Sequence, residues 1–496
     1  MNAFIRVALP LAAALGTGLA SEAAVAHSFG TVYNLPVPFW MYAYGASAAL
    51  IASFVIVAYL AGAARTARAG GAVQVHLRRD IGHLSAWGLA ALRSIALFLL
   101  VLCIVAGFIG SRNLYANINM TLFWVVFVLG FFYATAFIGD VYELINPWRT
   151  LCALIERLDS TAFRARVAYP KGLAYYPALV LYVPVIWIEL FAHTQPLSLA
   201  VVLFIYTLIN LAGAAAFGKD TWLRYGELFA VMFRLAGKMA PVEYVAAPGA
   251  RERYAVRLRK PFAALLTEPA EHWSLLLFVL FMLSSTAYDG IHETLPWVTI
   301  FWKDLYPPLA ALLAQPYVVI VDFYYYWQWA MLIVSPFIYL AIYALFIWLT
   351  KVAAASKLSV RTLGLRFAQS LVPIAFVYNV THYYTLLASQ GINIVTLISD
   401  PFGFGWNLFG TAKLLSGPLV LDAGTVWHTQ VGLILLGHIT GVYLAHVEAL
   451  AIFTNNRRAI LSQLPMLCLM VLFTTMGLWI LSLPIAAGQV VVPTPQ

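Results

Sequence analysis

Long apolar runs recur along almost the whole chain, separated by short polar segments. Most are close to twenty residues long, which is enough for a helix to cross the hydrocarbon core of a bilayer. The pattern predicts an all-α fold, a polytopic membrane bundle of about ten transmembrane helices. These cover residues 40–61, 86–109, 120–139, 174–192, 196–217, 273–289, 326–349, 367–390, 426–445 and 465–483.

A further apolar stretch, residues 306–322, lies between the sixth and seventh runs. Pro307, Pro308 and Pro316 interrupt it, and a proline inside a helix removes a hydrogen bond and clashes with the preceding turn. We therefore expect this stretch to be interfacial or re-entrant.

The N-terminus has the pattern of a signal peptide over residues 1–26. Arg6 precedes an apolar segment, and a small-residue cleavage site ends at Ala26. Cleavage would leave His27 as the first residue of one integral membrane domain, residues 27–496. The alternative is that the segment stays as an uncleaved helix.

Basic residues are distributed unevenly among the loops. Of the 29 Lys and Arg residues, 24 lie in the loops after the odd-numbered runs and three in the opposite loops, while Arg6 and Arg93 account for the rest. Because basic loops stay in the cytoplasm, this bias predicts a bacterial inner membrane protein with both mature termini in the periplasm. The longest basic loop, residues 218–272, is partly amphipathic. It suits a helix on the anionic inner leaflet or, equally, a solvated connector.

The remaining composition excludes other classes of protein. The chain is 63% hydrophobic and 10% charged, so lipid must replace water as its main solvent. Its net charge of +9 does not indicate nucleic-acid binding, because no basic face with interleaved aromatic residues is present. Cys103, Cys152 and Cys468 show no paired spacing, so neither a disulfide framework nor a thiolate metal site is expected.

Ionisable groups gather near the predicted outer ends of several runs. Such groups are costly in a membrane and need either a partner or a function. Glu189 lies four residues before His193, and Asp289 lies three residues before His292. Each pair therefore shares one helix face and offers two ligands to one metal ion.

The eighth and ninth runs add further polar groups. Asn379 and His382 share one face of the eighth run with Tyr378, and helix rise places His382 at a depth similar to that of His438. His428 begins the ninth run. The alternative for each histidine is a hydrogen-bonded contact between helices.

Two other places have a weaker pattern. A mature N-terminal His27 would offer its amine and its imidazole to copper or zinc, although the position could be an accident of cleavage. Asp140 and Glu143 precede Asn146-Pro147-Trp148-Arg149, where we expect them to cap helices and form pairs at the cytoplasmic interface.

Several phrases along nearly the whole chain resemble a family of bacterial polytopic membrane proteins described as fenitrothion hydrolase-like. The resemblance implies hydrolysis of organophosphate triesters by an integral membrane enzyme or by one subunit of it. The phrases are His27-Ser28-Phe29-Gly30, Asn34-Leu35-Pro36-Val37-Pro38, Gly139-Asp140 with Asn146-Pro147-Trp148-Arg149, Ser284-Ser285-Thr286-Ala287-Tyr288-Asp289-Gly290, Tyr378-Asn379-Val380-Thr381-His382-Tyr383, Asp400-Pro401-Phe402-Gly403-Phe404-Gly405-Trp406, Gly437-His438 with Ala445-His446, and Gln463-Leu464-Pro465-Met466.

For such a reaction we expect a divalent metal ion, zinc or copper, that activates water for attack on phosphorus. Asp289, His382 and His438 are the predicted catalytic ligands. The further candidates for the metal site are His428, Glu189, His193 and His27.

Two alternatives belong to other classes of protein. A transporter or a metal-handling protein would use the same polar cavity, and Pro184, Pro336 and Pro373 within the runs suit it. A b-type haem protein would use paired membrane histidines. A lipophilic substrate and a second membrane subunit are the partners we expect, beside the bilayer itself.

Overall fold

A computed structural model describes residues 38–67, 79–192, 194–246, 254–312, 316–414, 422–453 and 455–483. The predicted signal peptide, His27 and His193 lie outside these residues. Within them, nine helical segments are long and apolar enough to cross a membrane. They are α2 (Phe39–Ala67), α3 (Ala86–Ile109), the continuous run of α4 (Ile118–Met120), η1 (Thr121–Phe131) and α5 (Phe132–Ile138), α9 (Pro196–Phe217), α13 (Trp273–His292), α16 (Pro316–Ala353), the run of α17 (Val360–Phe367), η3 (Ala368–Leu371), α18 (Val372–Gln390), η4 (Gly391–Asn393) and α19 (Ile394–Leu397), α20 (Ala423–Ile452) and α21 (Asn456–Ser482).

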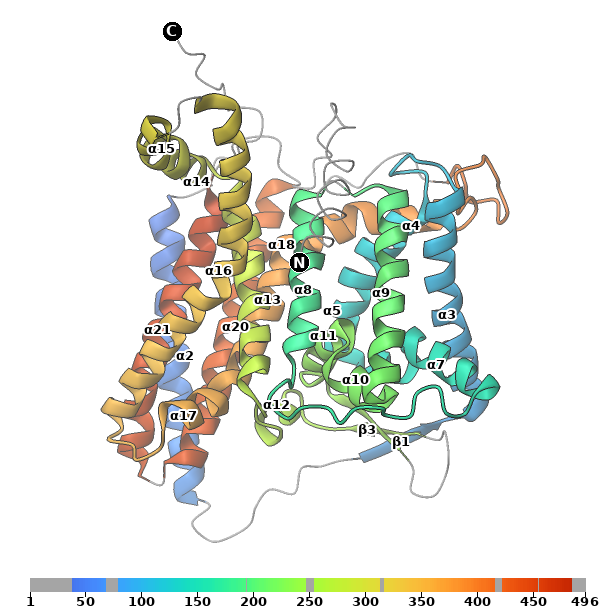
Figure 1. Ribbon diagram of the computed structural model, residues 1–496. Helices are drawn as coiled ribbons and strands as arrows, with labels where there is room; N and C mark the ends of the chain where they lie inside the picture. The colour runs from blue at the N-terminus through green and yellow to red at the C-terminus, as the bar shows by residue number, and fades with distance from the viewer. Residues whose placement is uncertain are drawn as a thin grey trace. The chain divides into compact units, whose positions relative to one another are not determined.

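The remaining predicted span, the fourth, corresponds to α8 (Tyr176–Phe191), which has 16 residues and is therefore about 24 Å long. It packs against α13 and α16, in the middle of the bundle in Figure 1. The prediction of an all-α polytopic membrane bundle of about ten helices is confirmed.

Shorter elements connect these helices. The short helices are α6 (Val141–Ile145), α7 (Pro147–Leu158), α10 (Lys219–Tyr225), α11 (Leu228–Gly237), α12 (Ala263–Thr267), α14 (Leu295–Thr299), η2 (Ile300–Leu305) and α15 (Tyr306–Leu312). The strands β1 (Arg79–Leu84), β2 (Val242–Ala246) and β3 (Tyr254–Leu258) form one antiparallel sheet in the order β1-β3-β2.

The prediction for residues 306–322 is wrong in its second half. Pro316 begins α16 and the helix continues without a break into the seventh predicted span. Proline is well tolerated at the first turn of a helix, because the missing N–H would have no partner there. Only α15, before Pro316, is a separate short helix, and it lies beside α14 at one end of the bundle (Figure 1).

Helix α13 is the most enclosed of the long helices. Every residue from Ser274 to Asp289 is buried, and the helix packs against α8, α16, α18 and α21. Helix α2 packs against α20 and α21, so the first described helix joins the last two (Figure 1). Polar side chains on α13 are thus held by protein on all sides.

Neither alternative for residues 218–272, a surface helix or a solvated connector, describes α11, because the apolar side chains of this helix contact protein. Leu228, Phe229 and Phe233 of α11 are almost fully buried, and α11 packs against α5, α6, α8 and α18. The amphipathic pattern therefore marks a helix that closes the bundle at the predicted inner side.

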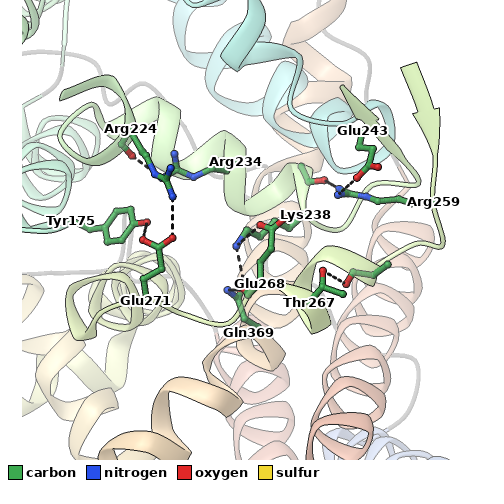
Figure 2. Close-up of polar contacts among 12 residues, drawn as sticks. Tyr175, Arg224, Arg234, Lys238, Glu243, Arg259, Thr267, Glu268, Glu271 and Gln369 are labelled. Atoms are coloured by element: carbon green, nitrogen blue, oxygen red, sulfur yellow. Dashed lines mark hydrogen bonds and ion pairs between the residues drawn. The ribbon is translucent and has the colours of Figure 1, made fainter. Parts of the chain in front are cut away.

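Polar contacts join the short helices at the predicted inner side, α10 and α11 among them, to the long helices (Figure 2). Glu271, just before α13, accepts hydrogen bonds from Arg224 at 3.1 Å and Tyr175 at 3.2 Å. Lys238, just after α11, lies 3.2 Å from the Glu268 carboxylate, and the Glu268 carbonyl accepts a hydrogen bond from Gln369 of η3. Segments far apart in the sequence are joined by these contacts.

The Asp140 and Asn146 motif caps helices, as we expected. Asp140 accepts a hydrogen bond from the backbone N–H of Glu143 at the start of α6, and Asn146 accepts two at the start of α7. The Asn146 side chain also donates to the buried carboxylate of Glu227, at 3.1 Å. Glu227 in turn caps α11 through the N–H groups of Phe229 and Ala230.

Candidate active site

Asp289 is buried near the C-terminal end of α13 and faces two side chains of α18. Its Oδ2 atom lies 2.6 Å from Nε2 of His382, and it accepts a hydrogen bond from the Tyr383 hydroxyl, also at 2.6 Å. Asp289 is 4% exposed and the His382 side chain is 11% exposed. A carboxylate and an imidazole in direct contact, shielded from solvent, form an acid–base pair.

The backbone of α13 supports this geometry. The Nδ1 atom of His292 lies 2.9 Å from the Asp289 carbonyl oxygen, and its ring stacks on that of Tyr288. Gly290 leaves room on the other side, because a Cβ atom there would lie 2.7 Å from Ile480 of α21 and 3.7 Å from the His382 ring. The absence of a side chain at Gly290 thus lets Ile480 of α21 approach α13 closely.

A small cavity of about 30 Å³ adjoins Tyr383, the residue that donates to Asp289. Its polar lining consists of Glu189 from α8 and of Asn379 and Tyr383 from α18, while α11 contributes Phe229 and Met232. A cavity of this volume with polar partners has room for a water molecule. It is far smaller than the several hundred cubic ångströms of a typical drug-sized ligand site.

Asn379 is fixed by a contact from α5. The Tyr133 hydroxyl donates to the Asn379 side-chain oxygen at 3.0 Å and lies 3.2 Å from its carbonyl oxygen. Tyr182 of α8 also lines the cavity, beside Glu189. Three separate helices, α5, α8 and α18, thus position the polar groups around one water-sized space.

The structure brings some of the predicted site residues together. Asp289 and His382 are in contact, and Glu189 lines the adjoining cavity. Neither Asp289 nor His382 lines the cavity, and neither do His438 and His428. His438 is buried on α20 with its Nδ1 atom 2.9 Å from the Ile434 carbonyl, whereas His428 is exposed and contacts the Gly424 carbonyl at 2.7 Å.

The predicted metal site has fewer ligands than we expected. In the part of the chain that the structure describes, no group of three or more His, Cys, Asp or Glu side chains is arranged to hold a metal ion. The contact of 2.6 Å between Asp289 and His382 is also shorter than the separation of two ligands on one zinc ion, roughly 3.3 Å for tetrahedral bonds of about 2 Å. The metal ion therefore stays a prediction.

Sequence reasoning missed three tyrosines of the site. Tyr383 lies next to His382, and Tyr133 and Tyr182 lie inside other apolar runs. Asn379 and Tyr383 are four residues apart, so their shared helix face was a usable signal. Tyr378, which we had grouped with Asn379, instead lies against Gly477 of α21.

Comparisons with known proteins add no assignment to this geometry. No protein-family model, curated protein or solved structure matches the chain. The resemblance to fenitrothion hydrolase-like proteins therefore rests on the quoted phrases alone.

Proposed function

We propose that this chain is an integral membrane hydrolase, or a subunit of one, that acts on organophosphate triesters such as fenitrothion. The observation that carries the proposal is the contact of 2.6 Å between Asp289 and His382. Tyr383, which donates to Asp289, lines a water-sized cavity. The resemblance supplies the substrate class. Neutral aromatic triesters also partition into lipid, so a site between membrane helices suits them.

In the proposed reaction His382 takes a proton from water while the water oxygen forms a bond to phosphorus. The bond between phosphorus and the aryl oxygen breaks, and the nitrophenolate leaves. The imidazolium then gives its proton to the phenolate or to water. Asp289 orients the imidazole and stabilises its cationic form, which makes the ring a stronger base. Tyr383 donates to the same carboxylate and fixes its position.

The cavity has room for the attacking water but not for the triester. The substrate must therefore enter as the surrounding helices separate. Helix α8, which carries Glu189, is short and contains Pro184, and a proline within a helix weakens its hydrogen bonding. We propose that α8 moves to admit the substrate.

The location of the site follows from the charge distribution. We propose that the chain lies in a bacterial inner membrane with both mature termini in the periplasm, because 24 of the 29 basic residues lie on one set of loops. Asp289 is three residues before the end of α13 at His292. On this orientation the site lies in the periplasmic half of the bilayer.

The first prediction concerns Asp289→Asn and His382→Ala. His382→Ala removes the base, and Asp289→Asn removes the carboxylate that orients it. Each variant should therefore lower the rate of nitrophenolate release about a hundredfold or more. The measurement uses the full chain in detergent, with any subunits that co-purify and with a dimethyl nitrophenyl triester. His428→Ala is the matched control, since His428 is exposed and does not line the cavity, and it should keep the wild-type rate.

Wild-type rates in both Asp289→Asn and His382→Ala would place the chemistry elsewhere. If no triester is hydrolysed even with co-purified subunits, the enzyme proposal fails. Uptake of a solute into proteoliposomes without turnover would then support the second candidate, a transporter or metal-handling protein. The buried carboxylate and imidazole favour that candidate, since such groups carry protons or ions in transporters.

A further inference from the structure

The loop that follows α19 exposes large apolar side chains at the end of the bundle where α3 meets α4 (Figure 1). We call residues 402–409 the aromatic loop. The exposed fraction is 52% for Phe404, 43% for Trp406, 60% for Leu408 and 68% for Phe409. Water solvates such side chains poorly, so a contiguous group of them marks an interaction surface.

The conformation of the aromatic loop is fixed by its own contacts. The Asp400 carboxylate accepts a hydrogen bond from the backbone N–H of Phe404 at 2.9 Å and one from that of Gly405 at 2.7 Å. Gly405 has a φ of 86°, which glycine adopts without steric cost. The rings of Phe402, Phe404 and Trp406 pack on one another with centroids 5.5 or 5.6 Å apart. The apolar side chains are therefore held in a defined arrangement.

The aromatic loop is docked against the turn between α3 and α4. The backbone N–H of Ser111 donates to the Phe402 carbonyl at 2.7 Å. The backbone N–H of Ile118 donates to the Pro401 carbonyl at 3.1 Å. A Cβ atom on Gly403 would lie only 2.7 Å from Cβ of Ser111, so the two segments are in close contact. These contacts hold the loop at the level where α3 ends.

The end of α3 faces lipid. Helix α3 is one of the helices long and apolar enough to cross a membrane, and only 17% of its most apolar stretch of 18 residues is buried. Its last residues, Phe108 and Ile109, are 41% and 60% exposed. The aromatic loop continues this apolar surface beyond the helix end. This is the level of the membrane–water interface, where Trp and other aromatic side chains are enriched.

The charges of the segment favour lipid over a protein partner. Among residues 398–414 the only charged residues are Asp400 and Lys413. The Asp400 carboxylate is bonded to the loop's own backbone, and a lysine near a bilayer can extend its ammonium group to the lipid headgroups. A protein partner is typically met through a polar rim, which this surface lacks.

We propose that the aromatic loop inserts into the bilayer, in the leaflet at the end of the bundle opposite the basic loops. Phe404, Trp406, Leu408 and Phe409 are the inserted side chains. They anchor the α3–α4 turn and the segment after α19 to the same leaflet. Insertion does not depend on triester hydrolysis, so either proposal can fail alone.

The test places a nitroxide spin label on the full chain in vesicles of phosphatidylethanolamine and phosphatidylglycerol. The labelled variants are Phe409→Cys and Leu408→Cys. Both carry Cys468→Ser, because Cys468 is exposed whereas Cys103 and Cys152 are buried. Power saturation measures how often each label collides with oxygen, which concentrates in lipid, and with the nickel complex of ethylenediaminediacetate, which stays in water.

Two labelled variants serve as references. Phe108→Cys on α3 reports lipid, and Asn113→Cys, at an exposed polar residue of the adjacent turn, reports water. We expect the ratio of oxygen to nickel collisions at Leu408→Cys and Phe409→Cys to match that at Phe108→Cys. It should exceed the ratio at Asn113→Cys severalfold. Melting temperatures in detergent show whether each variant is folded.

A further substitution separates insertion of the loop from insertion of the label alone. Phe404→Glu, added to Phe409→Cys, should raise the nickel collision rate severalfold, because a carboxylate resists entry into hydrocarbon. Phe404→Leu is the matched control and should leave the rate unchanged. A nickel rate at Phe409→Cys as high as that at Asn113→Cys would show that the loop lies in water. Low rates with both reagents would show that protein covers it, and either result would overturn the proposal.

Discussion

Two buried carboxylates in this bundle have different surroundings. Glu227 accepts hydrogen bonds from the hydroxyls of Tyr206 and Tyr142, the Asn146 amide and two backbone N–H groups. These donors satisfy the hydrogen-bonding capacity of the Glu227 carboxylate, so Glu227 acts as a structural cap. Asp289 instead faces an imidazole, a group that exchanges protons near neutral pH. The partners, rather than burial itself, distinguish Glu227 from Asp289, for which we propose a chemical role.

Asp140 gives a prediction of pH dependence. Burial, with Glu143 and Glu227 nearby, raises the pKa of Asp140 from 3.8 to about 7. A raised carboxyl pKa stabilises the fold fully below the unfolded value of 3.8, and this contribution disappears as the pH rises through about 7. Asp140→Asn keeps a side chain that can cap α6 but does not titrate.

We therefore expect Asp140→Asn to melt at a higher temperature than the wild type at about pH 8.5, by roughly 1–2 °C in a chain of this size. The difference should vanish near about pH 4. Thermal unfolding in detergent at several pH values measures it. If both proteins show the same pH dependence, Asp140 does not titrate in this way.

At the level of helices, glycine determines how closely α18 and α20 approach. A Cβ atom on Gly437 would lie 2.8 Å from Cβ of Val377, and one on Gly441 would lie 2.9 Å from the Ser370 carbonyl oxygen. Small residues four apart allow this close packing of membrane helices. Since α18 carries His382, the packing also positions the acid–base pair.

We predict that Gly437→Ala and Gly441→Ala each destabilise the bundle by about 1–3 kcal/mol, because a methyl group does not fit without moving backbone or branched side chains. Gly432→Ala on the same helix is the matched control, since nothing lies within 4 Å of a Cβ atom there. Thermal unfolding in detergent compares the three. Equal melting temperatures would show that the helices separate at little cost.

The errors of sequence reasoning also lie mainly at this level. Hydrophobic periodicity correctly predicted the long helices, but it cannot tell whether an apolar face contacts lipid or protein. The segment of α11 was therefore expected either on the membrane surface or in a solvated connector, yet Phe229 and Phe233 are buried against other helices. In the same way the prolines near residue 316 indicated a break, whereas Pro316 begins α16.

At the scale of the whole molecule, the site depends on segments distant in the sequence. Glu189, Asp289 and His382 lie on α8, α13 and α18, and only the packing of these helices on α13 brings them near one another. The chemical character of the residues was readable because charge is costly in a membrane. The sequence did not indicate which of these side chains lie in contact. For that reason His438, which is also buried in a neighbouring helix, was grouped with them.

The most direct test of the central claim follows the oxygen of the attacking water. Triester hydrolysis by the full chain in ¹⁸O-labelled water should put the label in the phosphorus-containing product and leave the nitrophenol unlabelled. Asp289→Asn and His382→Ala should lower the rate of this labelling about a hundredfold or more. Label in the nitrophenol, or labelling at the wild-type rate in both variants, would contradict water activation by the Asp289–His382 pair.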